Sequence, residues 1–138
     1  MFANGAVKYL PSLDLSNCKD LTQLFSYADD IVSVDKLKVN VTGSANAFTE
    51  CKNLEHIIFD GVMAGTGLNM KWSTKLDKES ITSVINALST TTTGLTVTLS
   101  KTAVDNAFAT AEGAADGSTS AEWLALVATR SNWTIALA

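Results

Sequence analysis

The sequence predicts an α/β fold made of stacked repeats, a solenoid, in a single domain that spans residues 1–138. Phe2, Phe25 and Phe48 follow one another at a constant spacing, and a similar series of apolar residues follows each of them. Six short segments show the alternation of apolar and polar residues that is typical of strands, and the second half contains helical patterns. A constant period of this size is typical of solenoids, in which each unit buries its apolar face against the next one.

The strands are expected where apolar residues occupy alternate positions. The six segments are residues 13–15, 37–39, 57–59, 68–72, 95–99 and 133–137. If they stack in chain order, they form one mainly parallel sheet above a continuous core. Residues 1–61 contain the regular units, and residues 62–138 contain irregular units and an atypical helical C-terminal cap, with a glycine-rich turn at residues 61–67. Because Phe2 already occupies a repeat position, we expect the natural polypeptide to begin upstream.

Three helices are expected in the second half. Apolar residues in residues 76–88 recur on one helical face, and Asp77 is the expected N-cap. A second helix is expected at residues 101–110. A third follows Thr119 and Glu122, which have the spacing of a capping box. Helices at this end would cover the last unit of the stack, because terminal repeats are atypical.

The composition excludes several classes of partner. The net charge is −4 and there is no basic patch, so we expect no nucleic acid partner. No run of 18 apolar residues is present, so we expect no membrane insertion. A surface with few charges and many Ser and Thr residues suits an exported or virion protein better than a cytosolic enzyme.

The residues that carry chemistry form no recognisable catalytic or metal site. His56 is the only histidine, and no nucleophile motif accompanies it. Asp29 and Asp30 are adjacent but lack the alternating ligands of a calcium loop. Cys18 and Cys51, with one histidine, do not make a zinc site, and both a disulfide and two free thiols stay open. We therefore expect no enzymatic activity, no metal and no cofactor.

The polar side of the expected sheet is the candidate partner-binding surface. Side chains on the non-core side of neighbouring strands would lie about 4.8 Å apart and form an extended mixed surface, which repeat proteins commonly use for recognition. A merely solvated sheet face is the alternative. The residues placed there by alternation are Ser12, Asp14, Lys36, Lys38, His56, Ile58, Asp60, Asn69, Lys71, Thr96 and Thr98.

Two segments resemble a known repeat family. Residues 10–17, LPSLDLSN, resemble the "LPxLDLSN" unit of the BspA-like leucine-rich repeats, and residues 47–54, AFTECKNL, are similar to their "AFxxCxxL" element. Phe2 and Phe25 match the phenylalanine of the same element. The resemblance covers residues 1–61; the residues beyond Gly61 look like the C-terminal region that often follows such repeats. It implies a leucine-rich-repeat solenoid with a strand-lined face and no enzymatic activity.

Proteins of this family occur on the surface of host-associated bacteria and in their phages, with roles in adhesion or recognition. The resemblance therefore implies a C-terminal portion of a recognition or adhesion module that binds a protein or glycan partner through its strand-lined face. Its expected location is extracellular, on a bacterial cell surface or a phage virion. The alternative is a structural subunit or terminal domain of such an assembly, with self-assembly through one end of the solenoid.

Overall fold

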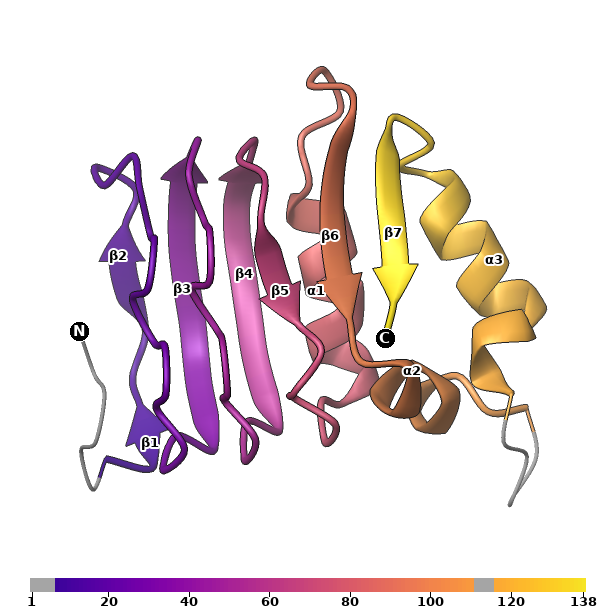
Figure 1. The fold of residues 1–138 in the computed structure, drawn as a ribbon, viewed down its shortest axis with the longest axis horizontal. Coiled ribbons are helices and arrows are strands. Elements are labelled where there is room, and N and C mark those ends of the chain that lie inside the picture. Colours follow the sequence, from indigo (N-terminus) through magenta and orange to yellow (C-terminus); the bar gives the residue numbers. More distant parts are fainter. Residues whose placement is uncertain (1–6, 111–115) are drawn as a thin grey trace.

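The computed structural model describes residues 7–110 and 116–138 (Figure 1), so Phe2 lies outside the described residues. The strands are β1 (Tyr9–Leu10), β2 (Leu13–Leu15), β3 (Ser33–Val41), β4 (His56–Met63), β5 (Leu68–Met70), β6 (Leu95–Leu99) and β7 (Trp133–Leu137). The helices are α1 (Lys78–Ala87), α2 (Lys101–Ala107), the 3₁₀ helix η1 (Gly117–Thr119) and α3 (Ala121–Ala128). Each of the six segments predicted to be strands overlaps one of these strands, although β3 and β4 extend beyond residues 37–39 and 57–59. Every strand pairing is parallel.

The first sheet has β3 at its centre. β1 and β2 pair with one side of β3, and β4 pairs with the other side. Leu13 is aligned with Leu37, and Leu37 is aligned with Phe59, so equivalent residues follow one another at close to the period of the sequence. Pro11 separates β1 from β2; because it has no backbone N–H, it breaks the ladder of this edge strand.

The segments that connect the strands repeat as well. The N–H of Leu21 donates to the carbonyl of Gly43 at 2.8 Å, and the N–H of Phe25 donates to that of Ala47 at 2.8 Å. Positive φ angles recur in these two segments at the same spacing as the phenylalanines. They are found at Gln23 (59°) and Tyr27 (60°), and again at Asn46 (56°) and Glu50 (61°). The period seen in the sequence is therefore a period of the backbone.

The repeated phenylalanines stack inside the molecule. The rings of Phe25 and Phe48 have centroids 5.3 Å apart and are stacked, and Phe48 meets Phe59 edge to face at 5.7 Å. Such pairs add about 0.5–1.5 kcal/mol to the burial of their apolar area. The buried apolar side chains form one cluster that extends from Leu21 to Trp133, and so it includes residues of both sheets.

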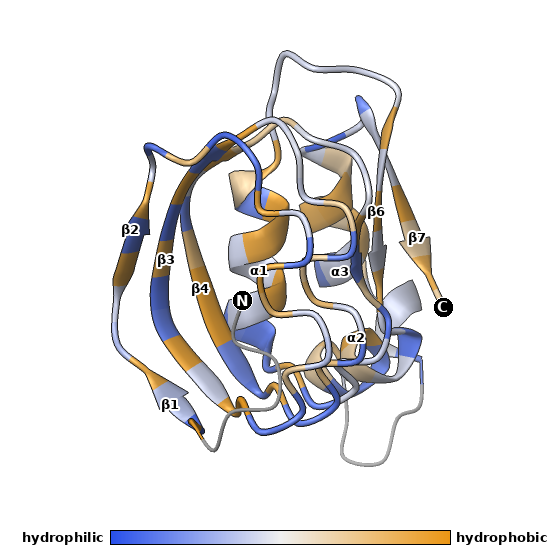
Figure 2. Cartoon of the chain, turned by 60° about the vertical axis from the view of Figure 1, so that its left-hand side comes forward, coloured by the Kyte–Doolittle hydropathy of each residue, from blue (hydrophilic) through white to orange (hydrophobic). Residues whose placement is uncertain are grey.

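The prediction of one sheet is wrong, because β5, β6 and β7 form a second, three-stranded parallel sheet. Figure 2 shows this sheet and the first one as separate layers on opposite sides of the molecule. The physical reason is that helix α1, and not another strand, packs along the free edge of β4. The chain then crosses from β5 through α1 to β6, the long connection that parallel neighbours require.

The helix ends agree in part with the predictions. Asp77 is the N-cap of α1, as predicted, and accepts a hydrogen bond from the N–H of Ser80. The second helix ends at Ala107, earlier than predicted. The capping box is wrong by one residue: Ser120, and not Thr119, is the N-cap of α3, because Thr119 belongs to η1.

The turn predicted at residues 61–67 begins later, because β4 continues to Met63. Gly61 lies inside this strand with φ at 120°, and a Cβ atom there would lie 2.0 Å from the carbonyl oxygen of Val39. Glycine is required here because it allows β4 to approach β3 so closely.

Candidate functional site

The structure divides the predicted surface between two sheets. The residues on or beside the first sheet are Ser12, Asp14, Lys36, Lys38, His56, Ile58 and Asp60. The other four, Asn69, Lys71, Thr96 and Thr98, belong to β5 and β6 of the second sheet or follow β5 directly. The first seven lie on the side of the first sheet away from the core. We call this side the outer face; no helix covers it in Figure 2.

A row of three charged residues crosses the outer face. Asp14 is aligned with Lys38, and Lys38 with Asp60, so a cation lies between two carboxylates on neighbouring strands. The Lys38 ammonium is 3.1 Å from the Asp14 carboxylate. Side-chain and backbone hydrogen bonds from Ser16, followed by that of Lys38, lower the pKa of Asp14 to about 2. Opposite charges on adjacent strands stabilise the pairing modestly and leave a hydrophilic surface.

An irregularity of β3 adds charge to the outer face. The register shifts between Val34 and Leu37, which both stay buried. Two residues, Asp35 and Lys36, therefore lie between them on the exposed side, where regular alternation would place one. Alternation alone identified Lys36 and missed Asp35. Val34 and Leu37 are three positions apart and not two, and this spacing is the feature of the sequence that indicates the extra residue.

A second row includes an aromatic residue that the sequence reasoning missed. Tyr9 is aligned with Ser33, and Ser33 with His56, at the beginning of the strands. Tyr9 is 70% exposed, an unusual state for a large aromatic residue on a sheet. Tyrosine combines a rigid apolar ring with a hydroxyl, so it is a common contact residue in interfaces.

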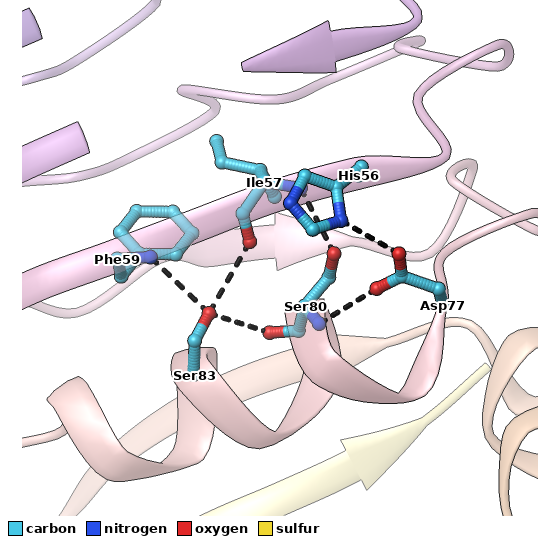
Figure 3. Close-up of polar contacts among 6 residues, drawn as sticks. All are labelled: His56, Ile57, Phe59, Asp77, Ser80 and Ser83. Atoms are coloured by element: carbon cyan, nitrogen blue, oxygen red, sulfur yellow. Dashed lines mark hydrogen bonds and ion pairs between the residues drawn. The ribbon is translucent and has the colours of Figure 1, made fainter. Parts of the chain in front are cut away.

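His56 makes a polar contact with Asp77 at the edge of the outer face. Its Nδ1 atom is 2.6 Å from an oxygen of Asp77, and the other Asp77 oxygen accepts the N–H of Ser80 (Figure 3). Burial alone would raise the pKa of Asp77, but the hydrogen bonds from Ser80 and His56 outweigh it and lower the pKa below its usual value. The pair joins the first residue of β4 to the start of α1.

The serine next to this pair is not placed as a nucleophile. The Ser80 hydroxyl is fully buried and accepts the backbone N–H of Ile57 at 2.9 Å. Figure 3 shows that His56 points to Asp77, whereas Ser80 points to the strand. A catalytic triad needs the serine hydroxyl bonded to the histidine ring, an arrangement that these three residues do not make.

Ser80 and Ser83 instead complete the edge of β4. Ser83 accepts the N–H of Phe59 at 3.2 Å and lies 3.2 Å from the carbonyl of Ile57. Beyond α1, the N–H of Ser89 donates to the carbonyl of Met63 at 2.8 Å. Serine hydroxyls of a helix thus take the place of the backbone groups of the next strand.

The four residues of the second sheet form a separate surface. Asn69 is aligned with Thr98, and Thr96 with Thr134, so small polar side chains lie side by side. The Lys71 ammonium lies 4.4 Å from the ring centroid of Trp72, a cation–π contact. Lys71 is therefore not part of the same surface as Lys36 and Lys38.

The cysteines and carboxylates do not gather into a metal site. Within residues 7–110 and 116–138, no three His, Cys, Asp or Glu side chains lie close enough together to hold a metal ion. Cys18 and Cys51 are both free thiols. Burial raises the pKa of Cys51 to about 12, and its thiol donates to the carbonyl of Phe25. Helices long and apolar enough to cross a membrane are not found in the described part of the chain.

Comparisons with protein-family models, with curated proteins and with solved structures found no match to this chain.

Proposed function

We propose that this chain is a non-enzymatic recognition module and that it binds a protein or glycan partner through the outer face of the first sheet. The observation that carries the proposal is an uncovered sheet side with the exposed ring of Tyr9 at one end and the row of Asp14, Lys38 and Asp60 across it. Ordered rows of hydrogen-bonding groups on a rigid sheet favour selective recognition. Charges on such a surface mainly determine specificity and association rate.

The proposal includes the repeat architecture. We infer a short solenoid of the BspA-like leucine-rich-repeat type, in which β1–β2, β3 and β4 are successive units and the C-terminal helices form an atypical cap. Its support is the near-constant spacing of the residues that are aligned between these strands, together with the equal spacing of the positive φ angles. With this architecture we propose an extracellular location, on a bacterial surface or a phage virion, and a mechanism that needs no cofactor.

The test separates the two surfaces that the sequence reasoning had joined. The variant Lys36→Glu/Lys38→Glu changes the outer face, and Lys71→Glu is the matched control on the second sheet. Glycan arrays and arrays of extracellular proteins are probed with the wild type first, and the dissociation constant of each hit is then measured for both variants. We expect the double variant to weaken binding about tenfold or more and the control to leave it within about twofold. No reproducible hit, or equal weakening by both variants, would show that the outer face is not the binding site.

One observation favours a second role, as a structural subunit or terminal domain of a phage particle or cell-surface assembly. The last strand of the second sheet, β7, has an edge without charged residues, and such edges readily pair with another strand. In that role, the second sheet and not the outer face would make the essential contact. The Lys36→Glu/Lys38→Glu variant would then retain its incorporation into the assembly.

A further inference from the structure

The C-terminal end of the molecule combines a strand edge with an apolar helix. Within residues 7–110 and 116–138, β7 pairs only with β6, so its other edge carries no strand. Helix α3 lies at the same end of the molecule as β7 (Figure 1). We call the β7 edge and the exposed side of α3 the terminal face.

Helix α3 is unusually apolar for an exposed helix. Its sequence is AEWLALVA, and Trp123 is its one buried residue. Leu124 is 53% exposed, and Leu126 and Val127 are only partly buried. The other exposed residues of the helix, apart from Glu122, are alanines: Ala121, Ala125 and Ala128. A helix that is apolar on all sides is normally covered on all sides.

The β7 edge has open backbone groups. The N–H and carbonyl of Ala138 bond to Leu99 and Lys101 at the β6 side, at 3.1 and 2.9 Å. Because alternate residues direct these groups to the same edge of a strand, those of Ile135 and Leu137 point away from β6. None of these four groups has a partner within the described residues.

The β7 edge also lacks the features that normally prevent an edge strand from pairing with another chain. Natural edge strands are protected by charged side chains, prolines or bulges. Residues 131–138 contain no charged side chain and no proline, and β7 pairs with β6 without a shift of register. The opposite end of the molecule differs, because Pro11 interrupts the β1–β2 edge and Asp14 adds a charge to it.

We propose that the terminal face binds a second copy of this chain, in a twofold dimer where β7 pairs antiparallel with β7 of the partner. A pairing centred on Ala136 places Ile135 opposite Leu137 of the partner subunit, and Leu137 opposite Ile135 of the partner subunit. Each of these two pairs exchanges two hydrogen bonds, so the four open groups of each copy are all used. The second sheet then continues through both copies.

The side chains on both sides of the sheet fit this arrangement. Ala136 lies opposite Ala136 of the partner subunit at the twofold axis. The two backbones approach most closely at this position, so a small side chain is needed. On the core side, Ile135 and Leu137 are only partly buried in one copy and would pack against their symmetry mates. The exposed side of α3 with Leu124 would meet the same helix of the partner, and its alanines allow a close approach.

Charge and area favour a second copy over a different protein. Residues 123–129 and 131–138 contain no charged side chain, so two chains of net charge −4 can meet here without placing like charges together. An eight-residue helix is about 12 Å long and a five-residue strand about 16 Å. The strand edge and the helix are each about 10 Å across with their side chains, so the face measures about 16 by 20 Å. Because its surface is uneven, it buries on the order of 500–600 Å² per copy, at the low end for a specific interface. The dimer should therefore be concentration-dependent.

The first test is a cross-link at the twofold axis. Ala136→Cys is introduced into a Cys18→Ser background, with Thr98→Cys, its aligned neighbour on β6, as the matched control. Opposite residues of such a pair have Cα atoms about 4.5 Å apart, within the range of a disulfide. Under mild oxidation we expect Ala136→Cys to form the covalent dimer at least tenfold faster than Thr98→Cys. Equal rates overturn the proposal.

The second test measures mass in solution by analytical ultracentrifugation. We expect the full chain to shift with concentration from 14.6 kDa toward twice this mass. Leu124→Lys should abolish the shift, whereas Val62→Lys, a change at a residue of similar exposure on β4, should retain it. Circular dichroism verifies that both variants are folded. A single-chain mass at every concentration up to about 100 µM contradicts the proposal, and the β7 edge would then bind a different partner. Neither result depends on the recognition function proposed above.

Discussion

Replacing Ser80 with alanine tests how α1 closes the first sheet. The Ser80 hydroxyl accepts the N–H of Ile57 at 2.9 Å, and both residues are fully buried, so water cannot replace the lost acceptor. Leaving a buried N–H without a partner costs about 1–3 kcal/mol. The higher helix propensity of alanine offsets up to about 0.5 kcal/mol of this cost.

The expected change is large enough to measure by thermal unfolding. For a chain of 138 residues, 1 kcal/mol corresponds to a change in Tm of about 3–4 °C. Ser80→Ala should therefore lower Tm by roughly 2–9 °C. Urea unfolding should show a lower midpoint with an unchanged slope, because the surface exposed on unfolding stays the same.

The matched control is Thr82→Ala on the same helix. The Thr82 hydroxyl has no hydrogen bond within the described part of the chain, so this change removes a hydroxyl without removing a contact to β4. We expect it to be neutral or slightly stabilising. If Ser80→Ala were as stable as Thr82→Ala, the Ser80 hydroxyl would not complete the edge of β4, and our account of how α1 ends the first sheet would be wrong.

Two further predictions concern the ends of α1. The lowered pKa of Asp77 means that its charged form stabilises the fold above its ordinary pKa of 3.8, and that this contribution is lost as the pH falls below that value. In urea unfolding, the stability advantage of the wild type over Asp77→Asn should shrink between about pH 5 and pH 3. A constant difference would contradict the stabilisation of the Asp77 carboxylate by Ser80 and His56. At the other end, Arg130 donates to the carbonyls of Leu88 and Asn86 at 2.9 and 2.8 Å, so Arg130→Ala should cost about 1–2 kcal/mol. Arg130→Lys should recover only part of the loss, and a fully stable Arg130→Ala variant would show that these bonds do not hold the helix end.

The sequence predicted the strands well because their signal is local. Leu13, Leu37 and Phe59 occupy equivalent positions, and the structure aligns them. The N-cap Asp77 was equally visible, because capping depends on neighbouring residues. The spacing of the phenylalanines is also found in the backbone, because turns of the same conformation recur at this spacing and stack on one another.

The division into two sheets was not visible in the sequence. Alternation identifies a strand and its two sides, but it carries no information about which strands pair. Leu68 and Phe59 follow one another in the apolar pattern, yet they belong to different sheets because α1 occupies the edge of β4. The candidate surface was therefore predicted as one row and is found as two. Tyr9 was missed because β1 is only two residues long and shows no alternation.

The edges of the two sheets connect these results. A parallel sheet leaves unpaired N–H and carbonyl groups at both edges. Three of the four edges in this molecule, those at β1–β2, β4 and β7, differ in how these groups are paired or protected. At β1–β2, Pro11 interrupts the edge; at β4, the hydroxyls of Ser80 and Ser83 complete it. The edge of β7 has neither a proline nor a helix that bonds to it within the described residues, although its side chains are the most apolar of the three. In the proposed dimer, the partner's β7 supplies hydrogen bonds to this edge, and the partner's α3 covers the apolar side of α3. A proline or a capping helix at the edge would not cover α3.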